Sequence, residues 1–292
     1  MLDVAKKVLN VAGYRFFPLE DPQAIRLPLR DFARDLGLRG TVLLGSEGVN
    51  IMLAGSPEQI ETMRKHFFET LNFPEFEWKE SWSSKQPFSR MLVKVKQEIV
   101  STGHRDIDAT SDTAKFLKPS ELKRWYDEGE DFVIYDTRND YEIRLGKFRN
   151  AQDLKVKNFR SFLEKVGEAP EEIKNKKVVT YCTGGIRCEK GTGVMLKKHG
   201  FKDLYQLEGG ILKYFEEVGG AHWEGECFVF DKRVGIAPSL EETPTEQCFA
   251  CRSPLTLAEQ SSEQYNPPES CPYCYQMTPE ERLIQKGSLE AG

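Results

Sequence analysis

The hydrophobic positions of the first hundred residues follow two spacings. Two stretches, which begin at Asp21-Pro22 and Ser56-Pro57, have apolar residues three or four positions apart, the spacing of an amphipathic helix. An Asp or Ser that precedes Pro is also a common helix start. Runs with the composition of β-strands occupy residues 11–18, 41–46, 49–56, 76–82 and 91–95. The order β-α-β-β-α-β predicts two helices that cover one face of an antiparallel sheet.

Residues 118–225 follow a different pattern, in which strands alternate with helices. The first helix is predicted to face inward with Leu122 and Trp125, and the apolar runs 131–138 and 176–182 are predicted to be buried strands. The second run leads into a glycine-containing loop and a further helix. This order predicts an α/β domain with a largely parallel sheet, whose site lies at the carboxyl ends of the strands.

Two segments lack such periodicity. Residues 101–117 are polar and are predicted to link the two domains, and residues 226–292 are rich in Pro, Ser, Glu and Gln. We therefore predict a ferredoxin-like α+β domain of the acylphosphatase-like kind over residues 1–100, a linker, an α/β domain over 118–225, and a C-terminal extension that only its cysteines could organise.

The composition is that of a folded protein. Of 292 residues, 39% are hydrophobic and 30% are charged. No apolar run approaches the ~18 residues of a membrane helix, and the N-terminus lacks a signal-peptide pattern. The seven cysteines include two Cys-x-x-Cys pairs and two that flank one loop, which suits catalysis and metal binding in a reducing compartment better than disulfides. We expect a cytoplasmic protein without membrane contact.

The run YCTGGIRC at residues 181–188 is the strongest chemical signal. A cysteine attacks or carries sulfur only as the thiolate, so it needs surroundings that lower its pKa. Glycines let the loop curl so that N–H groups point inward, the next helix presents its positive end, and Arg187 closes the ring. Cys182 is therefore the predicted nucleophile. The loop residues predicted to bind substrate are Thr183, Gly184, Gly185 and Ile186.

This loop resembles the active-site loop of rhodanese-homology domains. DTRNDYE at 136–142 is similar to their D-x-R-x-x-x-E segment. GKFRNA at 146–151 takes the place of their G-H-I-x-G-A segment, with Lys147 at the histidine position. GFKDLYQLEGGILKY at 200–214 resembles their last strand and glycine pair. The Cys-x4-Arg loop is one residue shorter than the Cys-x5-Arg loop of cysteine phosphatases, which disfavours phosphate ester hydrolysis. An inactive rhodanese fold kept for binding is the alternative, but such modules usually lose the cysteine.

Cys188 has two interpretations. It begins the helix after the loop, where many rhodaneses have Ser or Thr, and as a catalytic residue it would resolve a persulfide by forming a disulfide with Cys182. The alternative is a small side chain that packs beneath the loop.

The last cysteines predict a metal site. Cys248, Cys251, Cys271 and Cys274 have the spacing C-x2-C-x19-C-x2-C, in which two tight turns supply four thiolates to one tetrahedral ion. Zinc is the predicted ion, and it would provide most of the folding free energy of this polar segment. Redox-active pairs and unstructured thiols are the alternatives.

The whole arrangement resembles the rhodanese-related tRNA uridine hydroxylases of bacteria. This resemblance rests on the order of the domains and on the CTGGIRC loop, and GTG at 191–193 departs from the small helix-forming residues expected there. It implies that dioxygen converts the wobble uridine, tRNA position 34, into 5-hydroxyuridine, with an electron donor that the sequence does not identify. Rhodanese-type sulfurtransfer through a cysteine persulfide on Cys182 is the alternative function, and a zinc-bearing scaffold is a third.

A tRNA partner has limited support from charge. The net charge of −5 argues against indiscriminate nucleic-acid binding, yet residues 138–160 contain seven basic and three acidic side chains. Such an excess would seat phosphates, although an ordinary solvated face explains it too. Within this segment Arg138 is predicted to contact the substrate.

Overall fold

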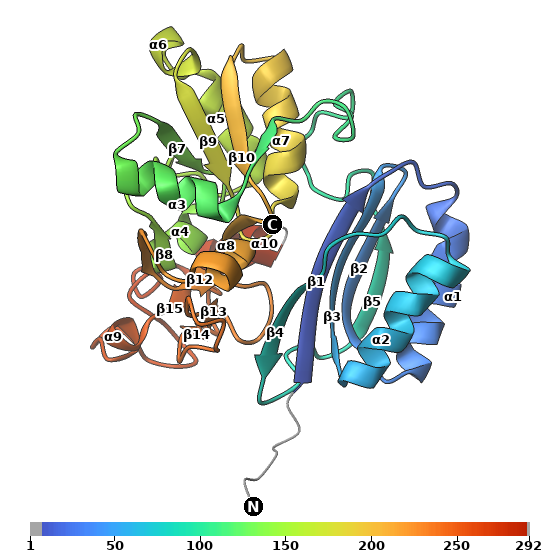
Figure 1. Ribbon diagram of the computed structural model, residues 1–292. Helices are drawn as coiled ribbons and strands as arrows, with labels where there is room; N and C mark the ends of the chain where they lie inside the picture. Colours follow the sequence, from blue (N-terminus) through green and yellow to red (C-terminus); the bar gives the residue numbers. More distant parts are fainter. Residues whose placement is uncertain (1–7, 291–292) are drawn as a thin grey trace, which may run out of the picture.

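The computed structural model describes residues 8–290, which form two folded domains and a C-terminal extension (Figure 1). The N-terminal domain consists of β1 (Val8–Phe16), α1 (Pro22–Asp35), β2 (Arg39–Gly45), β3 (Gly48–Gly55), α2 (Pro57–Lys65), a π-helical turn (His66–Thr70), β4 (Lys79–Ser83) and β5 (Met91–Val95). Its sheet has the order β4-β1-β3-β2-β5, in which only β2 and β5 are parallel neighbours. This confirms the predicted ferredoxin-like fold, which β5 extends by one strand.

Side-chain alternation gives this sheet two different faces. Val11, Val42 and Ile51 point to one side and are buried with residues of α1 and α2. Because successive side chains of a strand point to opposite faces, Ala12 and Tyr14 of β1 point to the other side. No helix of the N-terminal domain covers that side, which faces the second domain (Figure 1). The two domains therefore meet across the open face of the sheet.

The second domain is built on a parallel sheet with the order β6-β10-β9-β7. Helices α3 and α8 pack on one side of it and α5 and α7 on the other. Its elements are β6 (Lys115–Leu117), α3 (Pro119–Glu128), β7 (Val133–Asp136), α4 (Asp140–Leu145), β8 (Gly146–Phe148), α5 (Phe159–Gly167), α6 (Glu171–Lys174), β9 (Lys177–Tyr181), α7 (Ile186–Lys197), β10 (Asp203–Leu207), α8 (Gly210–Val218) and β11 (Trp223–Gly225). The predicted α/β architecture is confirmed.

The segment between the domains is more ordered than its polarity indicated. Ile107, Ala109 and Ala114 are buried, and the last three residues of the predicted linker form the edge strand β6. Lys190 of α7 fixes the domains to each other, since its ammonium is fully buried between the carboxylates of Glu47, at 2.5 Å, and Glu98, at 2.9 Å.

The C-terminal extension also has regular structure. It contains β12 (Cys227–Phe228), β13 (Gly235–Ile236), β14 (Glu246–Gln247), β15 (Pro254–Leu255), α9 (Leu257–Gln260) and α10 (Pro279–Glu290). It packs against α4, where Arg144 stacks on the ring of Tyr273 at 3.5 Å and donates a hydrogen bond to the carbonyl oxygen of Pro254. Within residues 8–290, no helix combines the length and the apolar character needed to cross a membrane.

Candidate active site and cysteine cluster

Cys182 lies between the end of β9 and the start of α7, in a loop that wraps around its sulfur. The N–H of Gly185 donates a hydrogen bond to Cys182 Sγ at 3.1 Å, and the N–H groups of Arg187 and Cys188 are also directed at it. Gly185 has a φ of 101°, which glycine adopts without steric penalty. The sulfur thus lies at the N-terminal end of a 12-residue helix, where negative charge is favoured.

The start of α8 holds the same loop from the opposite side. The N–H groups of Ile211 and Leu212 donate hydrogen bonds to the carbonyl oxygens of Cys182 at 3.0 Å and Thr183 at 3.1 Å. A Cβ atom at Gly210 would lie only 2.5 Å from the Cys182 carbonyl oxygen. The second glycine of the GG pair is therefore required for this close approach.

The surroundings of Cys182 favour its thiolate. Burial opposes the charged form, but a hydrogen bond from the Cys188 thiol, the charge of Arg187 and the backbone N–H groups outweigh burial and lower the pKa of Cys182. Burial and the neighbouring thiolate instead raise the pKa of Cys188. The pair thus holds one thiolate and one thiol, and Cys182 is the better nucleophile of the two.

Glu142 of α4 orients Arg187. The two guanidinium nitrogens Nη1 and Nη2 donate to Glu142 Oε2 at 2.8 Å and Oε1 at 2.7 Å, and the carboxylate is fully buried. Burial works against the guanidinium charge, but the charge of Glu142 dominates and raises the pKa of Arg187. The glutamate of the DTRNDYE segment therefore positions the cation that closes the loop.

The structure corrects the substrate-binding role predicted for Arg138. Its side chain is completely buried and forms an ion pair with Asp136 at 2.6 Å. It also donates to the carbonyl oxygen of Gly146 at 2.7 Å, and its guanidinium carbon lies 5.3 Å from the ring centroid of Trp223. A side chain enclosed in this way has no surface for a tRNA phosphate, so Arg138 stabilises the domain core. The sequence could not distinguish an inward-pointing arginine from an outward-pointing one.

Two further cysteines lie near the loop. The Cys188 thiol lies 3.7 Å from Thr137 Oγ1, beneath the loop, and both its proposed roles remain predictions. Cys227 of β12 is fully buried, which raises the pKa of its thiol. Cys227 is consequently a poor nucleophile at neutral pH.

Three residues that the sequence did not single out lie against the loop. Tyr14 of β1 donates a hydrogen bond to Glu189 Oε2 of α7 at 2.7 Å, and a Cβ atom at Gly185 would lie 2.8 Å from its hydroxyl oxygen. Lys79 of β4 lies beside Gly184, whose added Cβ would be 4.0 Å from Lys79 Cδ. Strand periodicity indicated the alternation of side chains at Tyr14 and Lys79, but no sequence signal indicated that this face of the sheet meets the loop.

A cleft of about 80 Å³ lies between the domains beside these residues. Thr183 is the loop residue that lines it, whereas Ile186 packs with Phe16 and Ile99 at the domain contact. Most of the accessible lining is apolar, and Lys79 adds a positive charge. Glu80, Asp231 and Arg233 also line the cleft, and the last two form an ion pair at 2.5 Å. The other residues that line the cleft include Met52, Phe88, Leu212, Val229, Phe230 and Ile236.

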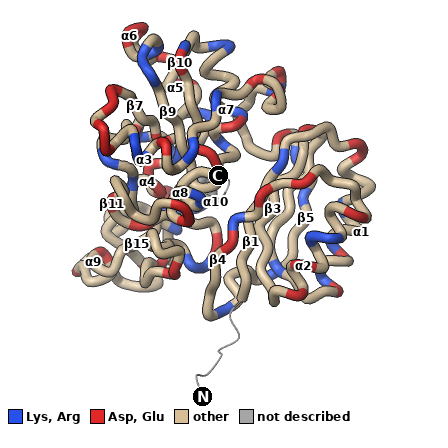
Figure 2. The backbone as a smooth tube through the Cα atoms, in the orientation of Figure 1, with Lys and Arg blue, Asp and Glu red and all other residues tan. Residues whose placement is uncertain are grey.

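The basic segment 138–160 is only partly available to a nucleic acid. Besides Arg138, Arg144 is engaged with the C-terminal extension. The exposed basic side chains of this segment are those of Arg144, Arg149, Lys155, Lys157 and Arg160, and Arg144 among them contacts the extension through Tyr273 and Pro254. Figure 2 shows basic and acidic residues interspersed along the backbone of both domains.

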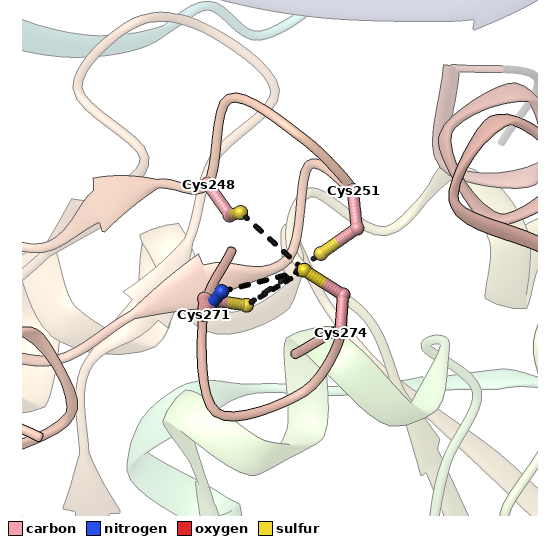
Figure 3. Close-up of side chains that lie close together, drawn as sticks. All are labelled: Cys248, Cys251, Cys271 and Cys274. Atoms are coloured by element: carbon pink, nitrogen blue, oxygen red, sulfur yellow. Dashed lines mark hydrogen bonds between the residues drawn. The ribbon is translucent and has the colours of Figure 1, made fainter. Parts of the chain in front are cut away.

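The four C-terminal cysteines converge on one point (Figure 3). Their sulfur atoms all lie within 4.8 Å of one another, and all four residues are buried. The distances are 3.9 Å between Cys248 and Cys274, 3.7 Å between Cys251 and Cys271, and 3.6 Å between Cys271 and Cys274. Four thiolates around one ion with metal–sulfur bonds of about 2.3 Å would be separated by about 3.8 Å. The predicted set therefore has the geometry of a metal centre.

Comparison with known proteins agrees with both domains. Residues 8–99 match the family model of the UPF0176 acylphosphatase-like domain, and residues 118–217 match the rhodanese-like domain. A tRNA uridine(34) hydroxylase of Cupriavidus taiwanensis is 42% identical over 273 residues, which cover 92% of this chain and 96% of the relative. The proteins of the same name from Paraburkholderia xenovorans and Ralstonia nicotianae are 42% and 41% identical, with the same shares of each chain covered.

Proposed function

Because this chain belongs to the tRNA uridine(34) hydroxylase family, we propose that it hydroxylates the wobble uridine of tRNA through the thiolate of Cys182. The observation that supports this role most directly is the loop itself. It surrounds one buried sulfur with backbone N–H groups and an oriented arginine, and thereby lowers the pKa of Cys182. A thiolate held in this way is a prepared nucleophile at neutral pH.

The proposed chemistry begins with addition to the base. Uracil is electron-poor at carbon 6, so the Cys182 thiolate forms a bond there, and the electrons of the C5–C6 double bond move toward carbon 5 and the oxygen on carbon 4. The loop amides and Arg187 stabilise the anionic groups of this step. The base has to leave the anticodon stack to reach the buried sulfur.

Carbon 5 is thereby activated toward an oxidant. Dioxygen is the proposed source of the oxygen atom, and an external reductant supplies two electrons for each hydroxyl group formed, while the second oxygen atom leaves as water. Addition and later release of the thiolate leave Cys182 unchanged, and the product is 5-hydroxyuridine.

Sulfurtransfer is the competing function, because the same loop would hold a persulfide on Cys182. The two functions differ in their product, which carries an added oxygen in one case and an added sulfur in the other. The relatives, all named as hydroxylases, favour oxygen.

The test is mass spectrometry of tRNA nucleosides from cells that lack this gene and are complemented with wild type or Cys182→Ala. We expect 5-hydroxyuridine-derived wobble nucleosides only with wild type, and growth under ¹⁸O₂ should label their oxygen on carbon 5. Unchanged nucleosides in the deletion strain, or a Cys182-dependent gain of sulfur, would contradict hydroxylation.

The cysteine cluster is proposed to hold one structural zinc ion. Four sulfur ligands without an open position are typical of structural zinc sites, and the cluster lies within the extension that packs against α4. Elemental analysis should find one zinc per chain, which Cys271→Ser abolishes. A folded chain with no metal, or with iron in place of zinc, would refute this assignment.

The cytoplasmic location stays a prediction that follows from a tRNA substrate.

A further inference from the structure

Lys79 has an unusual position for a lysine. It belongs to β4 at the edge of the N-terminal sheet, opposite Ala12 of β1, and only 8% of its side chain is exposed. Its stem passes Gly184, and its ammonium lies 5.8 Å from the ring centroid of Tyr14. Lys79 thus brings a positive charge from the N-terminal domain to the edge of the Cys182 loop.

This ammonium has no close partner. Its nearest carboxylate is Glu77 at 3.9 Å, too long for a hydrogen bond, and Glu77 lies closer to Lys213, at 3.1 Å. Among residues 8–290, Lys79 Nζ donates no hydrogen bond. Burial lowers the pKa of Lys79, while the charges of Glu77, Cys182 and Glu189 act in the opposite direction and that of Lys213 adds to the lowering. The Lys79 side chain is largely desolvated and its ammonium has unused donors, so a substrate acceptor would supply a hydrogen bond that the protein does not.

The cleft beside Lys79 has the character of a site for a flat, uncharged ring. Thr183 contributes a hydroxyl group, and Leu212, Met52 and Phe230 contribute apolar walls. The charges of Asp231 and Arg233, which also line the cleft, are paired with each other. Phe230 is 38% exposed, and its ring lies 5.7 Å from the guanidinium carbon of Arg187. Apolar walls with a few convergent polar groups are what a heterocyclic ring with carbonyl oxygens requires.

We propose that Lys79 is a catalytic residue, whose ammonium donates a hydrogen bond to the carbonyl oxygen on carbon 4 of uracil as Cys182 adds to carbon 6. This inference rests on the proposed function. One S–C6 bond forms, the C5–C6 π pair becomes the electron pair of an enolate, and its charge collects on that oxygen. No electron leaves the pair of reactants, so the step needs no oxidant. The N-terminal domain thereby supplies the hydrogen-bond donor to the developing oxyanion, and the second domain supplies the nucleophile.

The addition step has its own measurable consequence. The enolate accepts a proton from solvent at carbon 5, and reversal of the addition then releases a uracil whose hydrogen at carbon 5 has been exchanged. In D₂O without oxygen, full-length protein and tRNA should therefore introduce deuterium at carbon 5 of uridine 34, which mass spectrometry of the nucleosides detects.

Lys79→Met should slow this exchange about 100- to 1000-fold in fully bound tRNA, the size of effect seen when one donor to a developing oxyanion is removed. Lys79→Arg keeps a charged donor and should restore most of the rate, whereas Lys79→Gln should restore little. Lys85→Met, which changes an exposed lysine near the same strand, is the matched control and should exchange like wild type. Affinity for tRNA should stay within about threefold in all four variants, because Lys79 acts on the developing charge.

Three results would overturn the proposal. In the first, Lys79→Met exchanges like wild type, which removes any role in the addition. In the second, it loses only tRNA affinity and the binding becomes less salt-dependent, which assigns Lys79 to a phosphate. In the third, it slows alkylation of Cys182 by iodoacetamide as much as it slows exchange, which assigns Lys79 to the thiolate. A wild-type rate with Cys182→Ser would instead contradict the proposed function itself. If Lys79→Met fails to fold, the exchange rates of Lys79→Arg and Lys79→Gln test the proposal instead, and equal rates in these two variants would contradict it.

Discussion

The two cysteine groups of this protein have opposite surroundings. In the loop, Cys182 receives backbone N–H groups and the charge of Arg187, while Cys188 keeps its proton. In the extension, four sulfur atoms lie within 4.8 Å of one another. Four thiolates so close repel one another strongly unless a cation lies among them.

Because of this difference, the cysteine of the loop is reactive, whereas the cysteines of the extension give structural support. A lone thiolate that is stabilised by fixed donors keeps its electron pair available for a substrate. Thiolates that share an ion have their electron pairs committed to it, and their contribution is to folding. The groups are nonetheless connected, because the extension packs on α4 through Arg144, and α4 carries the Glu142 that orients Arg187.

Replacement of Cys182, the proposed nucleophile, should distinguish the role of the loop from that of the four extension cysteines most sharply. Cys182→Ala removes the atom that would bond to the base, so hydroxylation should fall at least about 1000-fold, while zinc content and thermal unfolding stay close to wild type. Activity assays on tRNA measure hydroxylation, and elemental analysis measures the zinc content. Hydroxylation that survives in Cys182→Ala would place the chemistry elsewhere.

Removal of the metal should have the next largest effect, with the reverse pattern. Cys271→Ser or a strong chelator should unfold the extension, at a cost of several kcal/mol of folding free energy, because structural zinc binding is largely folding energy. Activity should fall about tenfold or more through the loss of support for α4. Alkylation of Cys182 should continue. Calorimetry measures the unfolding of the extension, and thiol labelling measures the alkylation. If the extension stays folded without metal, the structural role is wrong.

A conservative change at Arg187 should lower activity by an intermediate amount and should leave the extension unaffected. Arg187→Lys keeps the charge but loses the two-pronged contact with Glu142, so the cation is misplaced and hydroxylation should fall about 10- to 100-fold. Zinc content should not change. Steady-state kinetics provide the measurement, and wild-type kinetics in this variant would show that the contact is dispensable.

The pH dependence of thiol alkylation should give the smallest but most specific effect. The rate follows the thiolate fraction, so for Cys182 it should rise with pH and reach its plateau below the range of an ordinary thiol. Cys188→Ala removes one hydrogen bond to the thiolate and should raise the midpoint by about half to one pH unit. The extension thiols, when bound to metal, should not react at any of these pH values. A midpoint near 8.5 for wild-type Cys182 would contradict the loop's effect.

Local sequence predicted the parts of the site that lie close together along the chain. The loop from Cys182 to Arg187 and the four extension cysteines have spacings that fix their geometry almost alone. The helix starts and the two sheet architectures also followed from spacing and capping residues.

Contacts between distant segments were not predictable in this way. Tyr14 and Lys79 reach the loop only because the open face of the first sheet meets the second domain. The prediction that Arg138 contacts the substrate fails because residue type does not give side-chain direction, and this side chain is buried in the core. The order in the linker comes from packing against other elements, which its polar composition did not indicate. For the extension, the cysteine spacing predicted the cluster but not the packing on α4.

The most direct test of the account is deuterium exchange at carbon 5 of uridine 34, measured without oxygen for wild type and for Cys182→Ser. We predict exchange with wild type and none with Cys182→Ser, although both bind tRNA, because only the thiolate can add to carbon 6. Absence of exchange with a wild-type protein that hydroxylates tRNA in air, or equal exchange by both proteins, would show that Cys182 does not act as the nucleophile.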